Sequence, residues 1–113
     1  EKKDIFKYLY QSDIYLSTSL YEGLPISILE AMSIGLPIVA SNVIGNCDTI
    51  QQGVSGFLYQ LNDSNTAVSY LVKLAENVDL RRKIGSAAFK RQRKIFSKNS
   101  MILNYINLYK NQV

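Results

Sequence analysis

The sequence predicts an α/β fold with a short parallel sheet flanked by helices and followed by a helical C-terminal segment. Three observations predict it. Residues 13–41 read as strand, loop, helix, tight turn and buried strand, which is the order of a βαβ unit joining parallel strands. A third short apolar run, residues 57–59, follows a glycine-rich turn. Residues 63–113 then carry helical periodicity.

The first half of the chain predicts two helices and three strands. Residues 1–11 place apolar side chains on one face and lysines elsewhere, as a short amphipathic helix does. Residues 13–18 predict the first strand. Residues 38–40 are a short apolar run typical of a strand covered on both faces, and residues 57–59 predict the third strand.

The helix between the first two strands is expected over residues 26–34. Pro25 suits its first position, where the missing N–H costs nothing. Gly35 is the residue expected just past a helix end, and Pro37 cannot continue the helix.

The connection to the third strand predicts little regular structure. Residues 42–46 form a polar loop, and residues 47–52 predict a single helical turn. We interpret Asp48 as a helix cap, because a short carboxylate side chain can accept hydrogen bonds from free helix N–H groups.

The remainder of the chain predicts helices with identifiable starts. Asp63 or Ser64 can cap the first, Asp79 the next, and Ser97 a last helix. The side chains expected to face inward are Ala67, Val68, Leu71, Leu74, Ala75 and Val78 in the first helix, Leu80, Ile84, Ala87 and Ala88 in the second, and Met101, Ile102, Tyr105, Ile106 and Tyr109 in the last.

Composition limits the classes of protein to which the chain can belong. Its 113 residues are enough for one modest domain, 1–113, and a hydrophobic content of 47% allows a real core. The chain has no histidine, which removes a Ser-His-Asp or Cys-His site and most zinc sites. The single Cys47 excludes an intrachain disulfide and suits a reducing compartment. We expect no metal and no cofactor.

Two acids interrupt the apolar segment at the start of the βαβ unit. Glu22 lies in the loop before the helix, and Glu30 lies within it. Ser27, Glu30 and Ser33 form one polar stripe on an otherwise apolar helix, so Glu30 is expected to be partly buried. A buried carboxylate needs partners, and the hydroxyls of a ligand are suitable ones. The helix N-terminus also suits a phosphate.

A plainer interpretation of the two acids remains open at this point. Glu22 can be a solvated loop acid, and Glu30 can pair with a lysine or cap a neighbouring loop. Spacing alone favours this alternative, since ion pairs and caps are commoner than ligand sites.

The motif resembles the donor-binding motif of retaining glycosyltransferases with the GT-B fold, and most of all family 4, the glycosyl transferases group 1. The residues that carry the resemblance are Glu22-Gly23-Leu24-Pro25, Glu30-Ala31-Met32 and Gly35-Leu36-Pro37-Ile38-Val39-Ala40-Ser41. The family has a glycine-rich segment followed by Glu at the place of Asp48. Here it is Ile44-Gly45-Asn46-Cys47-Asp48, with one of the two usual glycines.

The resemblance implies a Rossmann-like half of a GT-B enzyme that binds a nucleotide-sugar donor. Carried over by position, Glu30 would accept hydrogen bonds from the ribose hydroxyls, and Glu22 would hold the transferred sugar and act in catalysis. The donor-binding residues would be Glu22, Gly23, Leu24, Pro25, Ile26 and Glu30. No essential metal is implied.

The resemblance covers the later part of the C-terminal, donor-binding domain alone. It implies transfer of a hexose with retention of configuration to a glycan or lipid-linked acceptor, in polysaccharide or lipopolysaccharide biosynthesis. The N-terminal domain of the same protein would be a partner, and the 113-residue chain by itself is expected to be inactive. The alternative is a non-catalytic nucleotide-sugar-binding or docking subunit that complements a partner chain.

Charge is distributed unevenly along the chain. Residues 1–79 carry four basic and nine acidic side chains, whereas residues 80–113 carry nine basic and no acidic ones. A basic C-terminal third suggests an anionic partner. An anionic membrane at the cytoplasmic face is one candidate, solvated helix faces are the plain alternative, and the lack of a base-reading pattern argues against nucleic acid.

Overall fold

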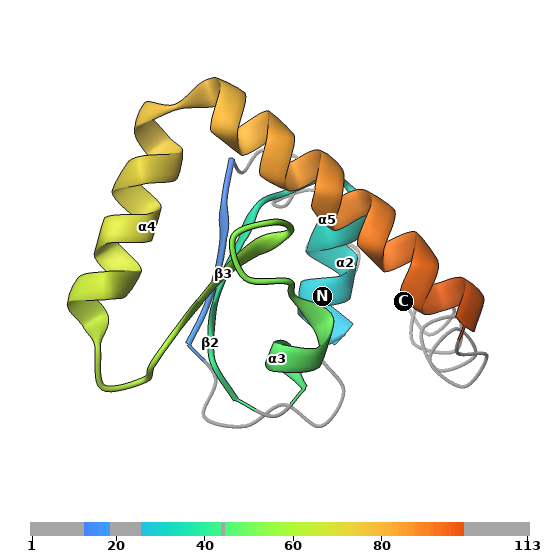
Figure 1. Cartoon of the computed structure of the whole chain (residues 1–113), viewed down its shortest axis with the longest axis horizontal. Helices are drawn as coiled ribbons and strands as arrows, with labels where there is room; N and C mark the ends of the chain where they lie inside the picture. The colour runs from blue at the N-terminus through green and yellow to red at the C-terminus, as the bar shows by residue number, and fades with distance from the viewer. Residues whose placement is uncertain (1–12, 19–25, 44, 99–113) are drawn as a thin grey trace, which may run out of the picture.

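The computed structural model describes residues 13–18, 26–43 and 45–98, the side chains of residues 96–98 excepted. Over these residues the elements follow one another as three strands and four helices (Figure 1). Their bounds are β1 Tyr15–Ser17, α2 Ile26–Ser33, β2 Ile38–Ser41, α3 Asn46–Thr49, β3 Gly56–Tyr59, α4 Ser64–Glu76 and α5 Val78–Lys98. The helix predicted over residues 1–11 and the last predicted helix beyond residue 98 lie outside the described residues.

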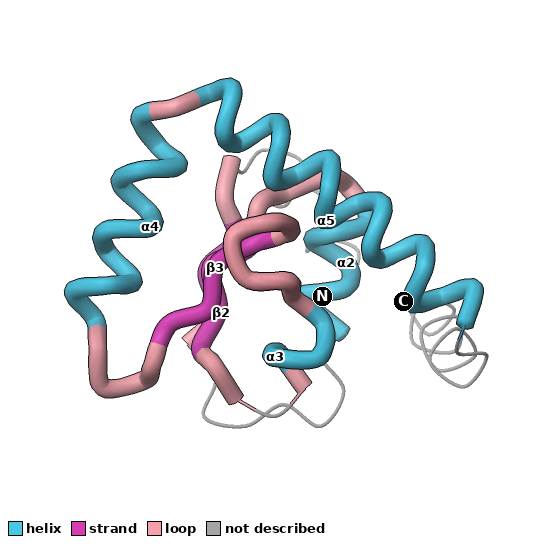
Figure 2. The backbone as a smooth tube through the Cα atoms, in the orientation of Figure 1, coloured by secondary structure: helices cyan, strands magenta, loops and turns pink. Residues whose placement is uncertain are grey.

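The strands form one parallel sheet in the order β1-β2-β3 (Figure 2). Leu16 is in register with Val39, and Val39 with Phe57, so these three residues share one face of the sheet. The predicted α/β class with a short parallel sheet is therefore confirmed, and the predicted strands lie where the apolar runs placed them.

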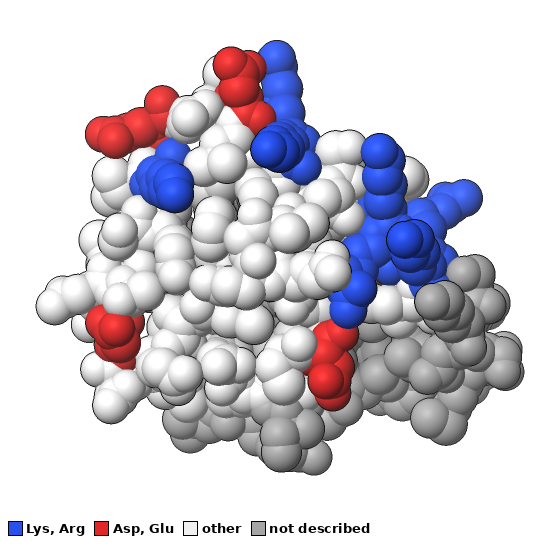
Figure 3. Space-filling model, in the orientation of Figure 1, with Lys and Arg blue, Asp and Glu red and all other residues white. Residues whose placement is uncertain are grey.

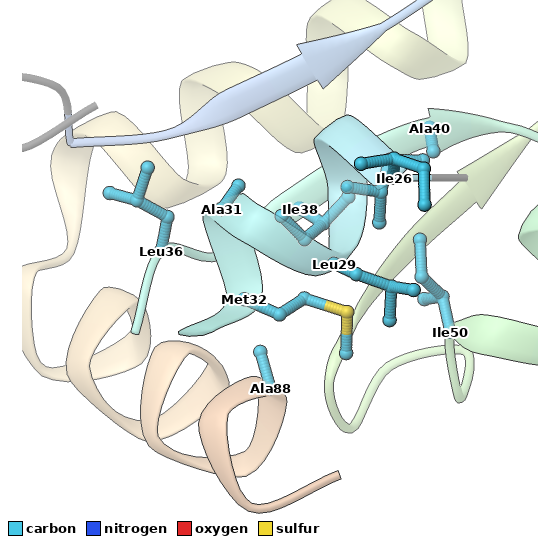
Figure 4. Packing of buried hydrophobic residues seen from close by; sticks show 10 residues of the cluster. Ile26, Leu29, Ala31, Met32, Leu36, Ile38, Ala40, Ile50 and Ala88 are labelled. Carbon is cyan, nitrogen blue, oxygen red and sulfur yellow. The ribbon is translucent and has the colours of Figure 1, made fainter. Parts of the chain in front are cut away.

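Helices cover both faces of the sheet. The core on one face joins α2, the sheet and the inner side of α5, and Figure 4 shows Leu29 and Met32 of α2 lying between Ile38 of β2 and Ala88 of α5. The core on the other face packs Val39 and Phe57 against α4. Because both faces are covered, β2 is buried along its whole length, as a central parallel strand requires.

The turn between α2 and β2 makes a close backbone contact with α5. Gly35 has a φ of 78°, a left-handed conformation that glycine adopts without a steric penalty, and its amide donates to the Met32 carbonyl at 3.0 Å. Gly85 of α5 lies so close that a Cβ at this position would overlap the Gly35 carbonyl oxygen. The close backbone contact brings α5 over the turn that ends α2.

Helix starts agree with the sequence at one position and differ at others. Asp63 caps α4, since its carboxylate accepts from the Thr66 amide at 3.1 Å and the Thr66 hydroxyl at 2.6 Å. The prediction for Asp79 is wrong, because the Asn77 side chain accepts from the Leu80 amide at 3.0 Å and Asp79 lies inside the first turn. Ser97 lies within α5, and the helix predicted to follow it lies outside the described residues.

The short helix after β2 differs from its prediction. α3 begins at Asn46 and ends at Thr49, and Gly45, with a φ of 97°, occupies the cap position without a side-chain cap. Asp48 is therefore not a cap: it is exposed inside the helix. The one turn that forms is set by the left-handed glycine, because a residue with a Cβ is strained in that conformation.

Part of the inward face predicted for α4 is also wrong. Ala67 and Leu74 are buried, but Val68 is 55% exposed, and Ala75 is exposed too. Val68 and Ala75 lie roughly 80–100° around the helix from Ala67, so a helix that rests on the sheet along one stripe leaves them outside. Val78, which begins α5, is 46% exposed.

Candidate functional site

The candidate site lies at the carboxyl edge of the sheet. Because the strands are parallel, β1, β2 and β3 end at the same edge, at Ser17, Ser41 and Tyr59. All three of these side chains are buried. In open parallel sheets ligands bind outside this edge, where the connections to the following helices begin.

Glu30 is the buried acid of α2. Its side chain is 3% exposed, in the second turn of a helix whose other buried residues are apolar. The Ser33 hydroxyl donates to the Glu30 backbone carbonyl at 2.6 Å, so the polar stripe is partly engaged with the helix itself. The predicted burial of Glu30 is confirmed. An ionised carboxylate offers several lone-pair sites and can accept hydrogen bonds from more than one donor at once.

The structure places two of the predicted donor-binding residues. Ile26 begins α2 and is 9% exposed, and Glu30 follows one turn later on the same side of the helix. The other predicted site residues lie outside the described residues: Glu22, Gly23, Leu24 and Pro25. The pairing of Glu22 with Glu30 therefore stays a prediction.

Two hydrogen bonds link the elements at the carboxyl edge, and the sequence predicted neither of them. The Tyr59 hydroxyl donates to the Ser17 carbonyl at 2.9 Å, linking β3 to β1 across the end of β2. Burial raises the pKa of Tyr59, which keeps the hydroxyl protonated and able to donate. The Asn46 side-chain amide donates to the Ser41 carbonyl at 3.0 Å and ties α3 to the end of β2.

Asn46 is the functional candidate that sequence reasoning missed. It is fully buried, and within the described part of the chain its Oδ1 atom accepts no hydrogen bond. A buried acceptor left open is costly, so most such atoms are engaged. The sequence placed Asn46 at the end of a polar loop. The signal that could have identified it is the Gly-Asn pair, because a left-handed glycine turns the following side chain back toward the strand.

α3 is held from the opposite side by Arg91, which is not among the α5 residues expected to face inward. Arg91 of α5 donates from Nε to the Thr49 carbonyl at 2.8 Å and from Nη2 to the Asp48 carbonyl at 2.9 Å. These carbonyls end a short helix and carry its negative dipole end, which favours a guanidinium there. The position of α3 at the site edge thus depends on α5.

A separate hollow lies between β1 and α4, on the face of the sheet opposite α2. Its volume is about 370 Å³. It is lined by Leu16, Thr18, Tyr59, Leu61, Ser64, Ala67, Val68 and Leu71. Most of these side chains are apolar, and none carries a charge, so the hollow fits apolar side chains better than a diphosphate.

Two features are absent from the part of the chain that the structure describes, a metal cluster and a membrane-spanning helix. Within that part of the chain, no three His, Cys, Asp or Glu side chains lie together as a metal site requires. Of the helices that the structure describes, none has both the length and the apolar character needed to cross a bilayer.

Comparison with protein families gives one match that covers most of the chain. The family described as glycosyl transferases group 1 matches residues 1–91. Among curated proteins, an α-1,3-galactosyltransferase of Escherichia coli, named for UDP-Gal and α-D-GlcNAc-diphosphoundecaprenol, is 40% identical over 76 residues, which are 67% of this chain and 20% of the relative. The amylovoran biosynthesis glycosyltransferase AmsK of Erwinia amylovora is 35% identical over 81 residues, 66% of this chain and 20% of that protein.

Solved structures share the fold over nearly the whole chain. Sucrose-phosphate synthase from Thermosynechococcus elongatus superposes with a TM-score of 0.82 at 22% identity, over 99% of this chain and 28% of that protein. Anabaena HepE, solved in complex with UDP-glucose, superposes with a TM-score of 0.77 at 25% identity, over 97% of this chain and 30% of that protein. The chain thus spans a fifth to a third of the length of these proteins.

Proposed function

Because the chain belongs to the glycosyl transferases group 1 family, we propose that it supplies the donor-binding part of an enzyme that transfers a sugar from a nucleotide sugar. The acceptor would be a glycan or a lipid-linked glycan, and the configuration at the transferred carbon would be retained. Support comes from relatives named as galactosyltransferase and amylovoran glycosyltransferase, and from a structural neighbour solved with UDP-glucose.

The observation that carries the proposal is the burial of Glu30. An acid with 3% exposure in an apolar helix is costly unless it is paired or hydrogen-bonded, and α2 is the helix that follows β1 in the βαβ unit. In the proposed complex its carboxylate accepts hydrogen bonds from the two ribose hydroxyls. Since a carboxylate has about four acceptor positions, it can do so while keeping its other contacts.

The start of α2 would receive the diphosphate. α2 has eight residues, and the N–H groups of its first turn, Ile26 included, have no carbonyl partner within the helix. As the sugar leaves, negative charge gathers on the diphosphate, and fixed N–H groups stabilise it without reorganising. Glu22 would contact the sugar hydroxyls and hold the sugar against its leaving group. We propose that this chemistry needs no metal and no cofactor.

The rest of the enzyme would come from an N-terminal domain of the same protein. β1 is one of the two edge strands of the described sheet, and Leu16 on it is 44% exposed beside the hollow that α4 helps to line. An apolar strand edge with an apolar hollow is a surface that another part of a protein covers. The 113-residue chain alone would therefore bind donor weakly and lack transferase activity.

The same surface is compatible with the alternative function, a nucleotide-sugar-binding subunit without catalysis that docks on a partner chain. The location proposed for either is the cytoplasm, with peripheral contact at the inner face of the plasma membrane. The exposed free thiol of Cys47 suits a reducing compartment.

Donor binding is tested by substituting the buried acid and a matched exposed one. A saturation-transfer NMR panel of uridine, guanosine and adenosine diphosphate sugars first identifies the donor. Glu30→Gln, which keeps the shape but removes the charge, is expected to weaken binding of the nucleoside diphosphate about 10- to 100-fold, the usual effect of losing a charged hydrogen bond. Glu76→Gln, at the exposed end of α4, is the control and should leave binding unchanged.

Equal binding by Glu30→Gln and wild-type chains, with both folded by circular dichroism, would refute the ribose-binding role. Catalysis is tested separately by Glu22→Gln in the complete protein, where transfer should fall far more than binding of the nucleoside diphosphate. Unchanged transfer would refute the catalytic role of Glu22, whereas binding of the nucleoside diphosphate without any transfer by the wild-type complete protein would favour the docking subunit. NMR of the product reports the anomeric configuration, and inversion would contradict a retaining reaction.

A further inference from the structure

The outer face of α5 is a basic surface that the proposed transfer reaction does not use. Over α5, Val78–Lys98, the one acid is Asp79 in the first turn. The exposed basic side chains are Arg82, Lys83, Lys90, Arg93 and Lys94. At about 100° per residue they fall within one side of the helix, and Figure 3 shows blue side chains gathered over α5.

An aromatic ring lies among these cations. Phe89 is 39% exposed, and the Arg93 guanidinium lies 5.5 Å from the centre of its ring. Basic side chains together with an exposed aromatic residue on one side of a helix are typical of helices that lie in a membrane interface, where the ring enters the headgroup boundary and the cations meet lipid phosphates.

The shape and position of α5 suit a flat anionic surface. A helix of 21 residues is about 30 Å long. It is fixed to the body of the protein by Arg91, which binds the end of α3, and by the close contact of Gly85 with the Gly35 turn. Its exposed face is therefore presented by a rigid element. Beside it, a hollow of about 150 Å³ is lined by Gln51, Ala87, Lys90, Arg91 and Lys94.

Charge elsewhere on the chain would orient such binding. Residues 1–79 carry nine acids against four basic residues, so an anionic surface repels that part and attracts α5. Nucleic acid fits less well, because direct readout of adenine needs an exposed amide side chain, and Arg82 and Arg93 supply only guanidinium contacts. Gln92 is the amide of α5, and it is 3% exposed.

We propose that the outer face of α5 binds an anionic phospholipid bilayer, with Phe89 at the level of the headgroups. This inference does not depend on donor binding, because the face lies outside the carboxyl edge of the sheet. Each basic residue near an anionic surface strengthens partition about fivefold, so removing three would weaken it roughly 100-fold at low salt.

The first experiment measures cosedimentation of the 113-residue chain with vesicles of phosphatidylcholine, alone or with 30% phosphatidylglycerol. Wild type should bind the anionic vesicles, and binding should fall as salt is raised. The variant Lys83→Gln, Lys90→Gln, Arg93→Gln should lose this binding. The control Gln60→Glu, Asn65→Asp, Lys73→Gln lowers the net charge by the same amount as the α5 variant, at positions away from α5. It should keep most of the binding to anionic vesicles. Equal losses in the two triple variants would overturn the proposal.

A second experiment measures how deeply the side chain at position 89 enters the bilayer. The chain has no tryptophan, so Phe89→Trp introduces a single tryptophan, which can be excited selectively in the presence of the eight tyrosines. Its emission should shift to shorter wavelength with anionic vesicles but not with phosphatidylcholine, whereas Val72→Trp on α4 should not shift. An unshifted Trp at position 89, or tighter binding to a random DNA duplex than to anionic vesicles at the same salt, would overturn the proposal. Nucleotide-sugar binding, measured alongside, should be unaffected.

Discussion

Replacing Gly85 by alanine tests how α5 is held against the α2–β2 turn. The added methyl group would overlap the Gly35 carbonyl oxygen, which is backbone and cannot rotate away. Overpacking of a well-packed contact costs about 1–3 kcal/mol, and a backbone obstacle puts this site near the upper end. Alanine recovers about 1 kcal/mol of helix propensity. The expected net loss of stability is therefore about 2 kcal/mol, or a fall in Tm of roughly 8 °C for a chain of this size.

The assay is urea unfolding followed by circular dichroism at 222 nm. Ser86→Ala, one residue further along α5 and exposed, is the matched control, since it improves propensity without meeting the turn. We expect a lower midpoint for Gly85→Ala and an unchanged or slightly higher one for Ser86→Ala. If Gly85→Ala is as stable as wild type or more stable, the helix propensity of alanine alone explains the result. The close contact between α5 and the turn is then refuted.

Two further predictions concern the ends of helices. Hydrogen bonds from Thr66 lower the pKa of Asp63 in the folded chain, so the contribution of Asp63 to stability is present above its unfolded-state pKa and is lost as the pH falls through its folded-state pKa. Asp63→Asn should therefore flatten the dependence of the urea midpoint on pH below about pH 4. An unchanged slope would contradict the role of Asp63 as the cap of α4. Arg91→Met removes both hydrogen bonds to the end of α3 and should lower the free energy of unfolding in urea by about 1–3 kcal/mol. The control Arg82→Met, at an exposed position, should change this free energy little. Equal losses of stability in the two variants would show that the contact with α3 contributes nothing.

Local sequence signals were sufficient to predict a helix end where a single residue determines the backbone conformation. Gly35 ends α2 because its left-handed conformation excludes side chains, and Asp63 caps α4 because its carboxylate reaches the Thr66 amide three residues on. The helix over residues 26–33 followed from the same kind of local pattern. Asp79, which precedes Leu80, was assigned as a cap, but Asn77 lies two positions earlier and takes that role.

The candidate site was predictable only in part. The burial of Glu30 followed from a helix with apolar residues on nearly every side, which has to be surrounded. Asn46 was missed because its burial depends on the path of the chain after a left-handed Gly45, and the Gly-Asn pair that signals this path stands in an otherwise polar segment. Tyr59 was assigned to a strand, but its partner Ser17 lies 42 residues away.

The order of apolar runs and turn residues determined the α/β class, the parallel strands and the burial of the acid in α2, because each of these follows from a pattern that is local in the sequence. Tertiary structure decided which side of α4 meets the sheet, that Arg91 holds α3, and that Gly85 touches the α2–β2 turn. Each of these joins segments that are far apart in sequence, and no local pattern records which distant backbone group a side chain will reach once the layers have packed.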